Sequence, residues 1–185
     1  MRARIISLPS ALVFLASLPL TPALAAPAEP TKPVPTNAFS VWAGDGHLVQ
    51  TGPDSVVIVG TFGGALFTNI NSDPDDIGTI RCPITLQVNL GSDSLNGNGS
   101  CEFTADDGAE AYGSWTCSGK FREGCRGDFR VTGGSGRLKD LKATSTFILR
   151  GRMAEFVTYP TEQVSAIGFA IWPDLRVLTQ VAEAK

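Results

Sequence analysis

The sequence is poor in the residues that most often bind metals. It contains a single histidine, His47, and no Cys-x-x-Cys pair, whereas zinc sites draw on several histidines or closely spaced cysteines. We therefore expect neither a metal nor a cofactor. Triad chemistry would have only His47 as its base, with Asp45 to orient the ring. The glycine-rich run from Gly133 is not a nucleophile elbow, because Arg137 stands where that motif has its last glycine.

Positive charge is also scarce. The chain has 15 basic and 18 acidic residues, a net charge of −3, and loss of Arg2 and Arg4 with an N-terminal signal would leave −5. Tight binding of nucleic acids depends on neutralising phosphates with Lys and Arg side chains. We therefore expect no nucleic-acid partner.

The N-terminal residues have the three parts of a secretory signal peptide. Two arginines are followed by an apolar run over residues 5–20 and by a small-x-small site that ends at Ala25. The apolar run is too short, and too interrupted by prolines, to cross a membrane. Residues 1–25 are thus predicted to be a signal peptide cleaved near Ala25. This predicts a secreted or periplasmic protein that has no membrane association after cleavage.

The residues after the predicted signal peptide form a leader and one domain. Residues 26–38 contain four prolines and little to bury, so they predict an extended or disordered leader. The folded domain is expected to run over residues 39–181.

The predicted mature chain contains an even number of cysteines, four. In an oxidising compartment such a set indicates disulfides, with three connectivities available. Cys117 and Cys125 enclose a seven-residue segment that could close a hairpin, and pairing them leaves Cys82 with Cys101. We expect these two disulfides.

The sequence lacks amphipathic helical patterns, and its 20 glycines, spread between Gly44 and Gly168, would break long helices. Apolar and polar residues alternate instead, as in residues 79–90, and segments such as 91–99 have turn chemistry. About eight to ten antiparallel strands predict an all-β, disulfide-bonded barrel, with a two-sheet β-sandwich as the alternative. Further strands are expected at residues 55–62, 65–70, 101–105, 111–117, 125–131, 141–149, 152–159, 163–172 and 175–181.

The segment FRVTGGSGRLKDLKATSTF, residues 129–147, resembles a pattern shared by dirigent proteins and the allene oxide cyclase barrel. In that pattern a strand enters a GGTG-like turn, followed by an apolar residue and a returning strand with a small-x-aromatic step. Ser135 stands where threonine is usual, and Ala143 where glycine is common. The resemblance implies an eight-stranded barrel with a central cavity, often in a homo-oligomer. The matching positions are Val131, Gly133, Gly134, Gly136, Leu138 and Phe147.

Candidate site residues are mainly aromatic. Glu155 shares a strand face with Met153 and Val157, so it is the candidate for an inward-pointing catalytic carboxylate. An acidic group around Asp107 is expected to cap a turn and not to bind a cation. Five aromatic residues could line a ligand pocket or fill a core: Trp115, Phe129, Phe147, Phe169 and Trp172.

Three functions are compatible with these features. The leading hypothesis is a secreted barrel that binds a small apolar or aromatic molecule. The second is an enzyme of the isomerase or cyclase kind, related in mode to allene oxide cyclase or dirigent proteins, in which a cavity shapes a reactive substrate. The third is a structural or protein-interaction module whose barrel is filled by its own side chains.

Overall fold

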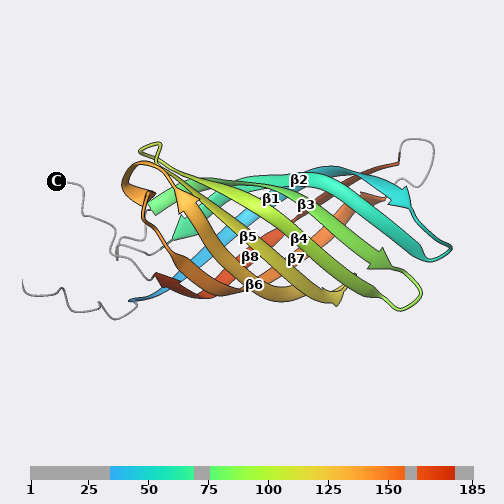
Figure 1. The fold of residues 1–185 in the computed structure, drawn as a ribbon. Helices are drawn as coiled ribbons and strands as arrows, with labels where there is room; N and C mark the ends of the chain where they lie inside the picture. Colours follow the sequence, from blue (N-terminus) through green and yellow to red (C-terminus); the bar gives the residue numbers. More distant parts are fainter. Residues whose placement is uncertain (1–33, 69–75, 157–161, 178–185) are drawn as a thin grey trace, which may run out of the picture. The chain divides into compact units, whose positions relative to one another are not determined.

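The computed structural model describes residues 34–68, 76–156 and 162–177. They form a closed barrel of eight antiparallel strands, in which each strand pairs with the next and β8 pairs with β1 (Figure 1). The predicted barrel is therefore confirmed, and the sandwich alternative is wrong. The elements are β1 (Val34–Gln50), β2 (Ser55–Thr68), β3 (Asp76–Asn89), β4 (Ser94–Ala105), β5 (Glu110–Lys120), β6 (Gly124–Gly134), the 3-10 helix η1 (Gly136–Leu138), β7 (Ala143–Phe156) and β8 (Gln163–Val177).

The barrel begins earlier in the chain than predicted. Strand β1 starts at Val34, inside the predicted leader of residues 26–38. Pro35 is accommodated because proline is tolerated near the start of a strand. Residues 1–25 and 178–181 lie outside the described part of the chain. Among the described residues, no helix has the length and apolar character needed to span a membrane.

Strand β2 combines two predicted strands, residues 55–62 and 65–70, into one. The glycines between them do not turn the chain. A Cβ on Gly64 would lie 1.9 Å from the carbonyl oxygen of Val41 on β1. This glycine therefore permits a close approach between strands, which is the other common role of glycine in a sheet.

Strands β8 and β4 are also longer than predicted. The strands expected at residues 163–172 and 175–181 are joined in β8. The loop expected over residues 91–99 is largely part of β4. A Cβ on Gly99 would lie 2.8 Å from the indole nitrogen of Trp115 on β5, so this glycine makes room for a ring instead of forming a turn.

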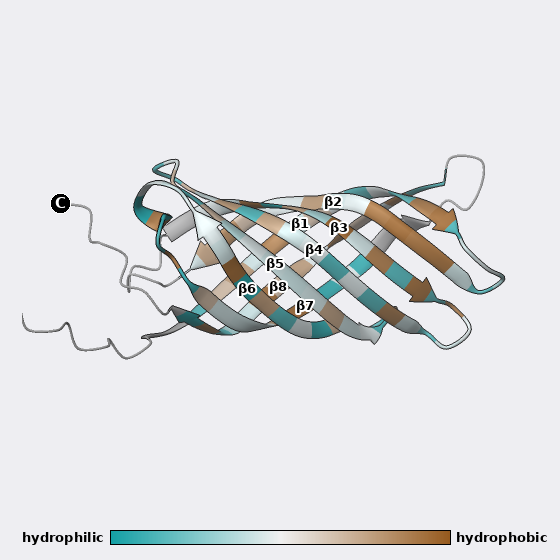
Figure 2. Ribbon diagram, in the orientation of Figure 1, coloured by the Kyte–Doolittle hydropathy of each residue, from teal (hydrophilic) through white to brown (hydrophobic). Residues whose placement is uncertain are grey.

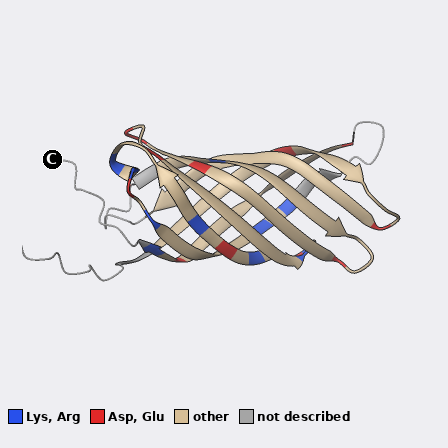
Figure 3. Ribbon diagram, in the orientation of Figure 1, with Lys and Arg blue, Asp and Glu red and all other residues tan. Residues whose placement is uncertain are grey.

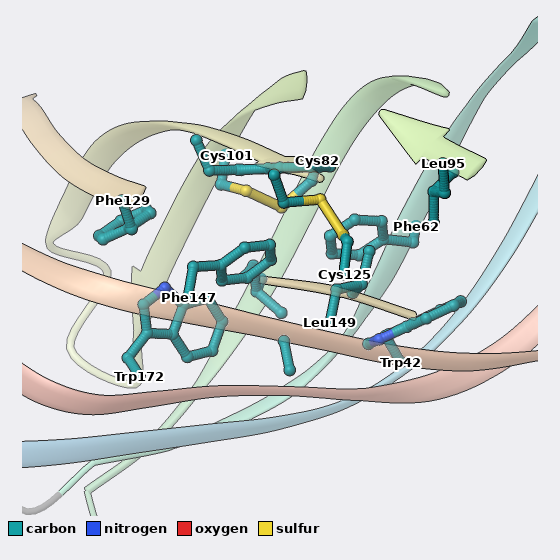
Figure 4. Close-up of a cluster of buried hydrophobic side chains, with 14 of the residues drawn as sticks. Trp42, Phe62, Cys82, Leu95, Cys101, Cys125, Phe129, Phe147, Leu149 and Trp172 are labelled. Carbon is teal, nitrogen blue, oxygen red and sulfur yellow. A yellow bond between two sulfur atoms is a disulfide. The ribbon is translucent and has the colours of Figure 1, made fainter. Parts of the chain in front are cut away.

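A continuous stack of aromatic rings fills the barrel interior (Figure 4). Successive ring centroids lie between 5.0 and 6.3 Å apart, with tilted and edge-on geometries that aromatic pairs prefer. The rings come from every strand of the barrel except β3 and form one core. Its rings follow one another in the order Trp42, Phe62, Trp115, Phe147, Trp172, Phe129 and Phe103.

Most of these rings face a glycine on a neighbouring strand. Trp42 pairs with Gly64 on β2 and with Gly168 on β8. Because cross-strand neighbours lie about 5 Å apart, a large ring fits more easily where the opposite residue has little or no side chain. The other ring–glycine pairs are Phe62 with Gly44, Trp115 with Gly99, and Phe147 with Gly127.

Both predicted disulfides are present. Cys82–Cys101 joins β3 to β4, and Cys117–Cys125 spans the β5–β6 hairpin. All four cysteines are buried, and the sulfurs lie against the aromatic stack (Figure 4). Structural disulfides persist in oxidising compartments, so they fit an extracellular or periplasmic protein.

Removal of the Cys82–Cys101 disulfide should destabilise the barrel more than removal of the Cys117–Cys125 disulfide. The two bonds span sequence separations of 19 and 8 residues, for which the chain-entropy relation gives about 3.2 and about 2.5 kcal/mol. Guanidinium unfolding of the two Cys→Ala double variants tests this order. The lost sulfur packing is similar in both variants because all four cysteines are buried, so a larger loss from the hairpin disulfide would contradict the prediction.

Candidate functional site

The barrel interior has two ends, which we name by the elements around them. At the η1 end, η1 lies between the end of β6 and the start of β7. At the hairpin end, tight turns join β1 to β2, β3 to β4 and β5 to β6 (Figure 1). The resemblance to allene oxide cyclase implies a central cavity, but the aromatic stack occupies the middle of this barrel. Hollow space is found in pockets towards the two ends instead.

The structure places four of the five predicted aromatic residues in the interior: Trp115, Phe129, Phe147 and Trp172. The prediction that Phe169 faces inward is wrong, since its side chain is 38% exposed on the outside. Alternate residues of a strand point to opposite faces, and the buried Ala170 and Trp172 set the inward face of β8. Of the five, only Phe129 and Trp172 border an end pocket.

The hairpin-end pocket is apolar and has a volume of about 280 Å³. That volume is close to the lower limit of about 300 Å³ for small-molecule sites. Arg122 and Arg152 also border the pocket. Its apolar lining comes from β1, β3, β4, β7, β8 and the β5–β6 turn, and consists of Trp42, Leu86, Leu95, Phe121, Leu149 and Ala166.

Trp42 is held in this pocket by a pair of glycines. Gly151 on β7 and Gly168 on β8 face each other across the two strands. A Cβ on Gly168 would lie 2.5 Å from Cζ2 of Trp42, and one on Gly151 would lie 2.9 Å from Cη2. Any larger residue at either position would push the indole ring out of its place.

Basic residues surround the hairpin-end pocket. Lys120 forms an exposed ion pair with Glu123, with Nζ and Oε1 3.1 Å apart, and this hydrogen bond raises the pKa of Lys120. Arg150 donates a hydrogen bond to the carbonyl oxygen of Glu123. Arg122 and Arg152 form no ion pair or hydrogen bond with the residues that the structure describes. Both guanidinium groups are therefore free to meet a polar group of a ligand.

Several buried polar groups lack a partner within the described part of the protein. They are the hydroxyl of Ser40 and the indole N–H groups of Trp42, Trp115 and Trp172. A buried donor without an acceptor costs about 1–3 kcal/mol. Trp42 borders the hairpin-end pocket and Trp172 the η1-end pocket. An acceptor atom on a molecule bound in either pocket would offset part of this cost.

The η1-end pocket is smaller, with a volume of about 90 Å³. The side chains of Leu138 and Leu141 close it. Asp107 fixes this cover, because its carboxylate accepts hydrogen bonds from the backbone N–H of Ala109 (3.0 Å) and from Nε of Arg137 (2.7 Å). The pKa of Asp107 is lowered mainly by the hydrogen bond from the Ala109 backbone, and next by the hydrogen bond from Arg137. The carboxylate caps the turn, as predicted.

A third hollow, of about 490 Å³, lies over strands β5 to β8 and is lined largely by polar side chains. Two aspartates, Asp128 and Asp174, and two arginines, Arg130 and Arg176, border it. Its charges are mixed, and they indicate no single class of ligand.

The buried polar residues of the described interior are Ser40 and Ser145. The titratable side chains lie outside this interior. His47 and Asp45 are exposed on β1. The side chain of Glu155 is not among the described ones, although its backbone pairs with Ser165. No group of three or more His, Cys, Asp or Glu residues in the described ranges could hold a metal ion.

No protein-family model matches the chain, and no curated protein matches it in sequence. Arguments about function therefore depend on the geometry of the pockets. Sequence reasoning missed the most informative pocket residue, Trp42, because the phase of β1 is not evident from its mixed composition. The signal that could have identified it is the spacing of glycines on the strands that flank it.

Replacement of Gly151 by alanine should displace Trp42. Overpacking of a filled core costs about 1–3 kcal/mol, and the indole fluorescence should change as the ring moves. Urea unfolding and emission spectra measure the two effects. Gly133→Ala is the matched control, because no atom lies within 4 Å of a Cβ at that position. Equal responses from the two variants would contradict the predicted contact.

Low pH should destabilise the segment with Leu138 and Leu141 that covers the η1-end pocket. The pKa of Asp107 is lowered in the folded protein, so its stabilising contribution is complete above the ordinary value of 3.8 and is lost as the pH falls through the lowered value. Amide exchange at Leu138 and Leu141, corrected for intrinsic rates, should accelerate in that range. In Asp107→Asn the same amides should exchange faster at neutral pH and lose this acid response. Identical pH profiles in the two proteins would disprove the role of the carboxylate.

Proposed function

We propose that the barrel binds a small apolar or aromatic molecule at its hairpin end. The observation that supports this most directly is the pocket of about 280 Å³ beside Trp42. Its leucine and aromatic walls favour an apolar body through the area removed from water. The unpartnered indole N–H of Trp42 and the guanidinium groups of Arg122 and Arg152 favour a ligand that also carries a hydrogen-bond acceptor.

The hairpin end suits this role better than the η1 end. A dry apolar cavity of about 150 Å³ is known to hold a molecule as small as benzene. The η1-end pocket, with about 90 Å³, is smaller than that and is covered by η1. Of these two end pockets, the hairpin-end one combines sufficient volume with free polar groups at its border.

A structural or interaction module is the second candidate, and the filled middle of the barrel favours it. The rings from Trp42 to Phe103 leave no central cavity, so the fold does not need a ligand to complete its core. The isomerase or cyclase alternative has less support, because the described interior contains no titratable side chain. Glu155 stays the candidate for a catalytic carboxylate in that alternative.

We also propose that the mature protein is secreted or periplasmic, after cleavage of a signal peptide near Ala25. The two disulfides support this location because thiols stay reduced in the cytosol. The likeness of residues 129–147 to dirigent proteins and allene oxide cyclase stays a proposal about ancestry. It assigns no pocket residue to this chain.

Ligand binding can be tested with the dye anilinonaphthalene sulfonate, an apolar ring system with one anionic group. The dye should quench the fluorescence of Trp42 when it binds. Ala166→Leu adds bulk to the lining of the hairpin-end pocket and should weaken binding by roughly tenfold or more, since it fills space that the ligand needs. Native mass spectrometry of protein from its own host should show a co-purifying molecule.

Ala105→Leu is the matched control, because it is also an alanine-to-leucine change but adds its bulk to the η1-end pocket. It should leave dye binding unchanged. If neither the dye nor a co-purified molecule binds, the structural alternative is correct. If Ala166→Leu leaves dye binding unchanged, the dye binds somewhere other than the hairpin-end pocket.

A further inference from the structure

The outer surface of the barrel is divided into a polar and an apolar part. Charged residues follow one another along β6, whereas β2 has none (Figure 3). The apolar run of β2 is visible in Figure 2. Of nine large apolar side chains exposed in the described residues, seven lie on β8, β1 and β2: Phe39, Val41, Val49, Val59, Phe67, Ile167 and Phe169.

The register of these strands brings the apolar residues into adjoining rows. There are three such rows, given at the end of this paragraph, and together we call them the outer apolar face. None of its residues is charged, and the ring of Phe39 lies 6.2 Å from that of Phe67 and 6.3 Å from that of Phe169. Read across β8, β1 and β2, the rows are Ile171–Phe39–Phe67, Phe169–Val41–Ala65 and Ile167–Ala43–Gly63.

Polar residues border the outer apolar face on both sides. On β7, Arg150 and Arg152 pair with Phe169 and Ile167, and on β3, Thr79 and Arg81 continue the same rows. An apolar centre with a polar rim that contains arginine is the usual anatomy of a protein–protein interface. Three rows on three strands cover about 300 Å². With the four rim residues, and with Val49 and Val59 beyond them, the same area per residue gives about 500 Å², more than half of the roughly 800 Å² that each partner contributes to a stable complex.

We propose that the outer apolar face is the contact between two copies of this chain. The face is self-complementary on β1 and β2, because the large Phe39 and Phe67 lie in one outer row and the small Ala43 and Gly63 in the other. On β8 both outer rows have an isoleucine, Ile171 and Ile167. A twofold axis perpendicular to the strands places the large row of one copy on the small row of the other. The absence of charge at the centre avoids repulsion between identical surfaces, and the rim arginines lie at the solvent edge, where salt screens them.

The association state of the full mature chain tests this proposal. Sedimentation and native mass spectrometry over a dilution series should show a dimer. Val41→Lys and Phe169→Lys each place an ammonium group in the middle row, where it would be buried without a partner. Each should raise the dissociation constant by roughly a hundredfold or more. Circular dichroism should show that both variants keep the strand content of the barrel.

Leu90→Lys is the matched control, since Leu90 lies in a turn outside the face with 47% exposure, against 52% for Val41. It should dimerise like the parent chain. The proposal is wrong if the parent chain is monomeric at every concentration, if the dimer survives both lysine variants, or if Leu90→Lys weakens it equally. Binding of the monomer to phosphatidylglycerol vesicles without dimerisation would also overturn it, by showing that a lipid surface is the partner.

Discussion

The contact between an inward aromatic ring and a glycine on the next strand is the constraint on which this barrel depends. Strands in a sheet lie less than about 5 Å apart, so a large inward ring needs free space beside it in a narrow barrel, and a glycine on the next strand provides that space. Trp42 meets this limit with glycine on both sides, at Gly64 and Gly168. Part of the high glycine content of the chain, which resembles turn chemistry in the sequence, is a consequence of this packing.

The same packing decides where a ligand can bind. Because the rings fill the middle, the interior is divided into a pocket at each end, and only the hairpin-end pocket is roomy. Its wall begins with the first ring of the stack, Trp42, so the core and the proposed site share one residue. A change in the glycines that support this ring therefore acts on stability and on the pocket together.

Strand alternation extends the effect to the outside of the barrel. On β1, Trp42 points into the core while its neighbour Val41 points outward, so strand phase fixes both surfaces at once. On β5 and β6 the outward positions are polar, as expected for a wet face. On β8, β1 and β2 they are apolar in the three rows of the outer apolar face, before Asp45 and His47 follow on β1. This gives the barrel a second apolar region that its own fold does not cover.

The sequence by itself determined the all-β class, the two disulfides and the alternation of inward and outward residues, because each follows from spacing within one or two neighbouring strands. It could not determine the number of strands, the filled middle or the outward direction of Phe169. Those depend on which residues face each other after the barrel closes, and β1 pairs with β8 from the far end of the chain. Whether Gly64 or Gly99 forms a turn or accommodates a ring is decided by a partner strand, which only the tertiary structure supplies.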